Sequence, residues 1–191
     1  MSTFATSSIG SLPEFSPGIA SLDSPQVQQT KVEIRSLVAE IADLANRRIE
    51  PNEFYRGMLP RVCSAMGATG ACVWSSTAEP EFSIIAQHAF PPSLIANDIH
   101  PSHPHRRILE CVFSEGQPVL VPPRSISLEV ERPTNPLDEA LLVVPIRMDE
   151  KIDYLLEVAQ KPGGGPVAQR GYLRFVAQMA DLLAYLATLA P

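Results

Sequence analysis

The C-terminal segment carries the pattern that most restricts the fold. Beyond the glycine-rich residues 161–165, apolar residues recur at spacings of three and four, which predicts one helix from about Pro166 to Ala190, about 35 Å long. It carries two adjacent apolar stripes. One consists of Leu173, Val176, Ala180, Leu183 and Ala187, and the other of Phe175, Met179, Leu182, Leu186 and Leu189. Two apolar faces need two partners: one should lie on a sheet, and the other against the first helix, the same helix of a second subunit, or both. Gly171 is expected to allow close packing near the helix start.

Length and charge exclude several classes of protein. With 191 residues, 45% of them apolar, the chain can form one hydrophobic core. It has 15 Lys and Arg against 21 Asp and Glu, and its formal net charge of −6 comes without a basic cluster. Because nucleic-acid binding needs clustered cations, we expect no nucleic-acid partner. No apolar run is long enough for a transmembrane helix, so we expect no direct membrane span.

The N-terminal segment differs in composition from the rest. Residues 1–29 are rich in Ser and Pro, contain no Lys or Arg, and lack the apolar stretch of a secretory signal. We predict a disordered tail over 1–29 and one domain over 30–191. The three cysteines, Cys63, Cys72 and Cys111, have no CxxC spacing and indicate neither a disulfide framework nor a zinc ribbon. This cysteine usage fits a reducing cytoplasm.

Two amphipathic helices are predicted at the start of the domain. Thr30 and Glu33 have the spacing of a capping box, which predicts a helix over 30–48. Its apolar stripe consists of Ile34, Leu37, Ile41 and Leu44. A second helix is expected over 51–67, with Pro60 kinking or splitting it.

The remaining elements read as antiparallel strands around a proline-rich crossing. Strand pairs are predicted over 71–76 with 81–89, and over 140–148 with 152–160. On the second strand, Phe82, Ile84, Ala86 and His88 are expected to share one face. The crossing, residues 90–136, contains a predicted helix over 104–115 closed by Gly116 and a short edge strand over 118–121.

This order of elements resembles that of a GAF domain. The resemblance covers about residues 31–190 and is carried by residues 54–74 (FYRGMLPRVCSAMGATGACVW), the closing strand pair and the long last helix. It implies an α+β fold: an antiparallel sheet of five to six strands, with the N- and C-terminal helices packed on one face and the proline-rich crossing on the other. GAF domains are sensory and regulatory modules, so the resemblance implies a non-catalytic, cytoplasmic role in signal transduction.

A narrower resemblance concerns three phrases. Residues 118–123 (PVLVPP), the pair Asn135-Pro136 and residues 168–175 (AQRGYLRF) look like the GAF-type regions found ahead of membrane-fusion (periplasmic adaptor, HlyD-like) modules in some bacterial efflux proteins. This implies a link to an efflux or membrane-fusion system. No such module follows in this sequence.

The resemblance leaves the ligand open. GAF domains bind cyclic nucleotides, linear tetrapyrroles, haem, amino-acid-like effectors, or only each other. The sequence has Ala159-Gln160-Lys161-Pro162 in place of the Asn-Lys pair of cyclic-nucleotide binders, and Cys111 lacks the histidine neighbour typical of tetrapyrrole attachment. The cofactor is therefore unknown.

In a GAF-like fold a small molecule would lie beneath the crossing. The aromatic and polar residues expected to line this site are Trp74, His88, Phe90, His105, Arg124 and Tyr154. Arg124 would face an anionic ligand. The alternative is that the loops fill this space with their own side chains and nothing binds.

The surplus apolar stripe of the last helix predicts a homodimer through the terminal helices. The expected interface residues are Ile34, Leu37, Ile41, Leu44, Val176, Met179, Leu183 and Leu186.

Two other functions are open. The cluster His100, His103 and His105 with Cys111 would suit a metal- or thiol-dependent enzyme. Three histidines this close, separated by prolines, surround an ion poorly, and the simpler interpretation is a loop in which Ser102 or His103 caps the following helix. The other alternative is a ligand-free scaffold.

Overall fold

The computed structural model describes residues 25–47, 49–76, 82–97, 103–125, 134–148, 151–163 and 165–189. The described elements, in chain order, are α1 (Pro25–Asn46), α2 (Pro51–Met66), β1 (Gly70–Ser76), β2 (Phe82–His88), α3 (Pro92–Asn97), α4 (Pro104–Glu115), β3 (Val119–Val121), β4 (Ala140–Met148), β5 (Lys151–Gln160) and α5 (Gly165–Leu189). The strands form one antiparallel sheet in the order β2-β1-β5-β4-β3. The predicted α+β class is confirmed, and the short helix α3 is the one described element that the sequence did not predict.

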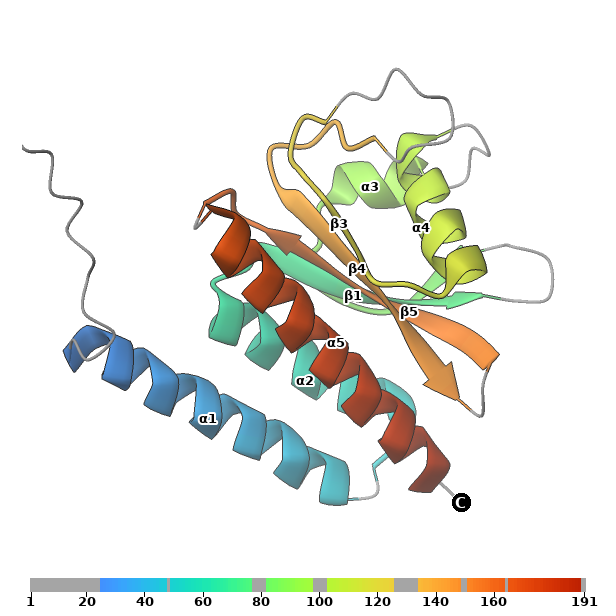
Figure 1. Ribbon diagram of the computed structural model, residues 1–191. Helices are drawn as coiled ribbons and strands as arrows, with labels where there is room; N and C mark the ends of the chain where they lie inside the picture. Colours follow the sequence, from blue (N-terminus) through green and yellow to red (C-terminus); the bar gives the residue numbers. More distant parts are fainter. Residues whose placement is uncertain are drawn as a thin grey trace, which may run out of the picture.

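The elements are arranged in layers around the sheet (Figure 1). Helices α2 and α5 cover one face, α3 and α4 lie on the other, and α1 lies outside α2. The first helix is therefore not part of the layer that contacts the sheet. No helix among the described residues combines the length and apolar character needed to cross a lipid bilayer.

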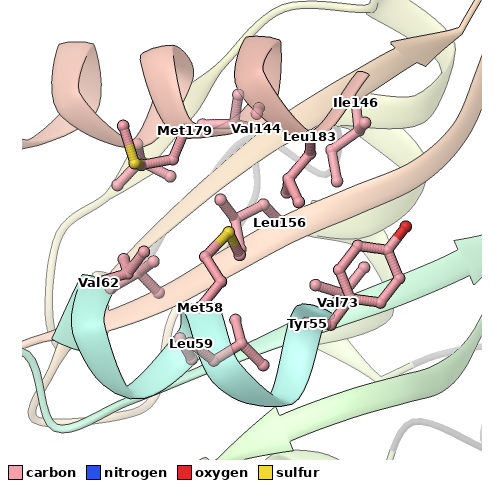
Figure 2. Packing of buried hydrophobic residues seen from close by; sticks show 14 of the residues in the cluster. Tyr55, Met58, Leu59, Val62, Val73, Val144, Ile146, Leu156, Met179 and Leu183 are labelled. Atoms are coloured by element: carbon pink, nitrogen blue, oxygen red, sulfur yellow. The ribbon is translucent and has the colours of Figure 1, made fainter. Parts of the chain in front are cut away.

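The face under α2 and α5 holds the larger of two apolar clusters, the helix-side cluster (Figure 2). Met58, Leu59 and Val62 of α2 are fully buried here. They meet Val73, Val144, Ile146 and Leu156 from the strands and Met179 and Leu183 from α5. Removing these side chains from water is the main favourable term that holds both helices on the sheet.

Local sequence explains where α2 begins and ends. Pro51 occupies the first turn, where its missing N–H has no partner to lose. Gly67 ends the helix in the left-handed conformation (φ 63°), and the backbone N–H groups of the cap donate to the carbonyls of Cys63 and Ser64. Pro60 does not divide the helix. The buried apolar side chains on both sides of it keep the chain helical across the one missing hydrogen bond.

The start of α1 differs from the prediction. The helix begins at Pro25, five residues before Thr30, so the predicted capping box lies inside the helix and does not begin it. Proline is favourable in a first helical turn, which explains the earlier start. The predicted tail over 1–29 therefore includes the first turn of α1, and residues 1–24 lie outside the described residues.

Helix α1 contacts α2 through a close approach of side chain to backbone. A Cβ atom added at Gly57 would lie 2.5 Å from Leu44 Cδ2. Because glycine has no side chain, Leu44 can pack directly against the backbone of α2. Beside this contact, Arg61 Nε donates to Glu40 Oε2 at 3.0 Å. Because both side chains of the ion pair are partly exposed to solvent, it adds little stability, and the apolar contact holds the helices together.

The predicted dimer interface needs a correction. Ile41, Val176, Met179 and Leu183 are each at most 4% exposed and lie in the chain's own helix-side cluster. They are not available to a second subunit in this structure, because the sheet and α2 already cover them. Ile34, Leu37 and Leu44 are partly buried on α1, and the side chain of Leu186 lies outside the described residues.

Gly171 also differs from the prediction. It is exposed on α5, and a Cβ built on it would meet no heavy atom within 4 Å. It therefore serves no close packing among the described residues.

A bulge changes the faces of β2. Val73 pairs with Ala86 and Trp74 pairs with Ile84, so Ile85 is an extra residue opposite β1. Strand residues before and after it consequently point to different faces: Phe82 and Ile84 pack on the face that α3 and α4 cover, whereas Ala86 packs in the helix-side cluster. The prediction that Phe82, Ile84, Ala86 and His88 share one face is wrong for this reason.

Candidate functional site

The sheet face opposite α2 and α5 holds a second apolar cluster, here called the α4-side cluster. The strands contribute Cys72, Trp74, Val121, Leu141, Val143, Leu155 and Ala159. They are covered by Ile108, Leu109 and Val112 of α4, together with Phe90 and Leu94. The small molecule predicted from the sequence would bind on this face, which α3 and α4 cover in Figure 1.

Glu157 lies within this apolar layer. It is on β5, the central strand of the sheet, and is 0% exposed. Strand alternation places it there, because Leu155 and Ala159 belong to the same cluster whereas Leu156 and Val158 face α2 and α5. A buried carboxyl group is unfavourable unless hydrogen bonds replace its water.

Three side chains supply those hydrogen bonds. Trp74 Nε1 donates to Glu157 Oε2 at 2.7 Å, and His105 Nε2 lies 2.8 Å from Oε1 and 3.0 Å from Oε2. The Cys72 thiol adds a longer contact, with Sγ 3.8 Å from Oε2. Both carboxyl oxygens are therefore engaged. We call Glu157, His105 and Trp74 the buried triad.

His105 reaches Glu157 because of how α4 begins. Pro104 occupies the first turn, and His103 caps the helix, its Nδ1 accepting from the His105 backbone N–H at 3.3 Å. This confirms the predicted cap. The His105 ring packs beside two aromatic rings of this layer, with ring centroids 5.6 Å from Trp74 and 6.4 Å from Phe90.

The structure divides the predicted ligand residues into two groups. Trp74, Phe90 and His105 lie together on the α4 side, with the Trp74 and Phe90 centroids 6.2 Å apart. His88 and Tyr154 do not join them.

Their register explains this. His88 is exposed and pairs with Ala71, a residue of the helix-side cluster, and paired residues of an antiparallel ladder share a face. Tyr154 packs against the helix-side cluster, with its ring 6.5 Å from that of Tyr55. Both residues therefore lie on the opposite face from Trp74, and the prediction that they point beneath the crossing is wrong.

Arg124 lies at the surface. Its side chain is 76% exposed and forms an ion pair with Asp138, whose pKa is lowered by the hydrogen bond and the nearby positive charge. This placement corrects the prediction that Arg124 points into the ligand site.

A buried asparagine shapes the rim of this face. Asn135 is 0% exposed, and its Nδ2 donates to the carbonyls of Val121, Pro122 and Glu139. Its Oδ1 accepts from the Leu137 backbone N–H at 3.0 Å. These bonds tie the loop before β4 to the end of β3, so Asn135 is a structural residue of the rim.

The residues proposed for a metal- or thiol-dependent enzyme make separate contacts in the structure. His103 caps α4, His105 contacts Glu157, and His100 lies outside the described residues. Among the residues that the structure describes, no three His, Cys, Asp or Glu side chains gather as a metal-binding group. Cys111 is half-buried, and burial together with Glu115 raises the pKa of its thiol, which disfavours the reactive thiolate.

Glu157 was missed at the sequence level. A signal was available: one acidic residue, Glu157, interrupts the apolar run of residues 154–159 in the predicted strand over 152–160. A charged residue in a central strand must have a partner, but its partners are 52 and 83 residues away in the chain.

Comparison with known proteins identifies the fold. No protein-family model matches the chain, and no curated protein is significantly similar to it in sequence. Solved structures do match. The A. aeolicus Nlh2 GAF domain in an inactive state is 14% identical with a TM-score of 0.64, covering 85% of this chain and 99% of that one.

Two further structures agree with it. The GAF domain of a phosphoenolpyruvate-protein phosphotransferase from Coxiella burnetii is 14% identical with a TM-score of 0.61, covering 83% of this chain and 95% of that one. The phycoerythrobilin-bound GAF domain of a cyanobacterial phytochrome is 13% identical with a TM-score of 0.59, covering 84% and 97%. The chain has the fold of a GAF domain.

Proposed function

We propose that this chain is a non-catalytic regulatory module that binds a small molecule on the α4-side face and dimerises through its terminal helices. The observation that carries the proposal is the buried triad. An apolar layer with a few converging polar groups is the usual composition of a small-molecule site. Here Trp74 and Phe90 supply aromatic surface, and Glu157 and His105 supply hydrogen-bonding groups.

The fold supports small-molecule binding and a regulatory role in general. One of the similar structures is the phycoerythrobilin-bound GAF domain of a cyanobacterial phytochrome, so a domain of this fold binds a small molecule. Others are described as GAF domains of a putative sensor histidine kinase and of a phosphoenolpyruvate-protein phosphotransferase. Proteins of this kind transmit signals, which favours a regulatory role for this chain as well.

A dimer would use the sides of α1 and α5 that the chain's own core leaves uncovered. Val32 on α1 is 58% exposed and Tyr185 on α5 is 62% exposed, both unusually accessible for large apolar side chains. A second copy covering them would shield this surface from water. We include a cytoplasmic location in the proposal, since the three cysteines are free thiols. The link to a membrane-fusion partner rests on the sequence phrases alone.

Native mass spectrometry of the full chain tests the proposal, because it reports a retained small molecule and the number of subunits together. A thermal-shift screen of a metabolite library covers ligands lost during purification. We expect Trp74→Phe to weaken binding, because it removes the donor to Glu157 and part of the aromatic surface. Tyr154→Phe, a matched aromatic change on the opposite face, should leave binding unchanged.

Each part of the proposal has its own contrary result. A protein that retains no small molecule and is stabilised by none in the library would disprove ligand binding. A monomer at micromolar concentration by light scattering would disprove the dimer, and Tyr185→Glu should convert a dimer to monomer if the interface is correct.

A further inference from the structure

Polar contacts near its start and at its end join helix α4 to the sheet. Near its start, His105 Nε2 lies 2.8 Å from Glu157 Oε1 on β5. At its end, Arg147 on β4 donates to the carbonyl oxygen of Gly116, the residue that caps the helix. Between them the contacts are apolar, through Ile108, Leu109 and Val112. The two ends differ in their chemistry, since the first contact joins an imidazole to a carboxyl group and the second joins a guanidinium to a backbone carbonyl.

The pair of His105 and Glu157 has no net charge only when the two side chains share one proton between them. With one proton shared along the Nε2–Oε1 line, the pair is either imidazolium beside carboxylate or imidazole beside carboxylic acid, and the net charge is zero in both. A second proton, taken from solvent, leaves imidazolium beside carboxylic acid. That state places a net positive charge among side chains that are 0% exposed.

Hydrogen-bond directions oppose the second proton as well. Trp74 Nε1 can only donate, and it points at Glu157 Oε2 from 2.7 Å. An imidazolium also only donates. A carboxylic acid hydroxyl at this place would therefore face donors, whereas the carboxylate accepts from all of them.

The remaining charged groups near α4 are engaged elsewhere or lie away from the triad. On α4 itself, Arg106 pairs with Glu110 at 2.9 Å, and Arg107 and Glu115 are exposed. The other titratable and charged groups on the elements that pack here are Cys72 on β1, His88 on β2, Cys111 on α4, Arg147 on β4, and Lys151, Asp153 and Tyr154 on β5, with His103 as the helix cap. Of these described groups, Cys72 contacts Glu157, and its thiol is a neutral donor at acid pH. None of them supplies an anion beside the triad to balance a second proton.

We propose that the His105–Glu157 contact is a proton-sensitive latch that holds α4 on the sheet and releases it when the pair takes a second proton. Release exposes the α4-side cluster, including Trp74, while the separate helix-side cluster keeps α2 and α5 on the sheet. This goes beyond the proposed ligand binding, because the latch opens whether or not the protein has a ligand. A regulatory domain with this device would respond to acidification directly.

The protein carries its own reporter for this motion. Trp74 is the single tryptophan of the chain, is 2% exposed, and contacts both members of the latch. Its accessibility to acrylamide measures opening of the α4 side. Far-UV circular dichroism of the same samples measures whether the helices are still folded.

The experiment follows both signals in the full chain from about pH 8 to about pH 4, a range that covers the ordinary titration of imidazole and carboxyl groups. In the wild type we expect the acrylamide quenching constant of Trp74 to rise severalfold before helical signal is lost. The double variant His105→Gln/Glu157→Gln keeps hydrogen-bonding amides at both positions and removes both titrating groups. We expect it to lose the acid-induced rise.

The control removes the neighbouring histidine and leaves the latch intact. His103→Asn takes away an imidazole but keeps a side chain that caps helices well, so it should open at the same pH as the wild type. The proposal is overturned if Trp74 becomes accessible only together with the loss of helical signal in the wild type. It is also overturned if the double variant keeps the rise, or if His103→Asn abolishes it. Absence of a ligand affects none of these outcomes.

Discussion

Replacing Glu157 by Met tests whether the buried triad is the polar centre of the α4-side face. In the wild type the N–H groups of Trp74 and His105 lie 2.7 and 2.8 Å from the Glu157 carboxyl oxygens. The methionine side chain offers these buried groups no such acceptor. Each such group costs about 1–3 kcal/mol, and breaking a buried ion pair costs about 3–5 kcal/mol. For a chain of this length, about 2–4 °C per kcal/mol predicts a melting temperature roughly 6–20 °C lower.

Urea unfolding of a double-mutant cycle measures the coupling. The variant His105→Leu/Glu157→Met removes both members of the pair, so the Trp74 N–H and the weakly donating Cys72 thiol lose their acceptor but no charged partner is left behind. The double variant should therefore cost clearly less than the sum of the singles. Glu110→Met is the matched control: its pair with Arg106 is partly exposed, and the cost should stay below about 1 kcal/mol. The reasoning is refuted if Glu157→Met costs no more than this control, or if the two single changes are additive.

Three further predictions concern stability and reactivity. Gly70→Ala should destabilise the protein by about 1–3 kcal/mol, because its Cβ would lie 2.6 Å from a backbone carbonyl carbon at the end of β2. Gly171→Ala, at an exposed position of α5, should stabilise the protein by up to about 1 kcal/mol. Urea midpoints equal to that of the wild type would contradict both predictions. Burial raises the pKa of Tyr55 to about 12, with a contribution from the neighbouring tyrosine, and that of Cys63 to about 11. These folded-state pKa values lie above the ordinary 10.0 and 9.0, so the two protonated side chains stabilise the folded state fully below pH 9.0. This stabilisation is lost as the pH rises through the folded-state values. Denaturant midpoints should therefore fall between pH 9.0 and the folded-state values, and they should fall less in Tyr55→Phe. A thiol reagent should modify half-buried Cys111 before buried Cys63 in the native protein, and Cys111→Ser should remove the fast phase; an unchanged fast phase would show that another thiol reacts first.

Most elements could be predicted because their signals are local. Pro51 and Pro104 begin helices and Gly67 and Gly116 end them, since proline suits a first turn and glycine adopts the left-handed cap. The strand pairs and the long last helix follow from apolar periodicity alone. Helix α3 has only six residues and shows no complete apolar period, which explains why it was missed.

The faces of the sheet could be predicted only in part. Alternation holds over residues 154–159 of β5, but a register shift beside β4 places Ile152 on the same side as Leu155. The bulge at Ile85 likewise inverts the assignment for the second half of β2. A bulge depends on how two strands fit together, and nothing in a seven-residue strand fixes it in advance. His88 was placed on the wrong face for this reason, and Trp74, Phe90 and His105 were grouped correctly.

The amino-acid sequence by itself determined the elements, their order and the need to bury two stripes on the last helix, because periodicity and helix-end chemistry act over a few residues. Only the tertiary structure decided what buries them: β4 and its neighbours, together with α2, take up Val176, Met179 and Leu183. It also decided that Glu157 meets His105 and Trp74. Contacts between residues so far apart depend on register and layer order, which are set when the whole chain packs.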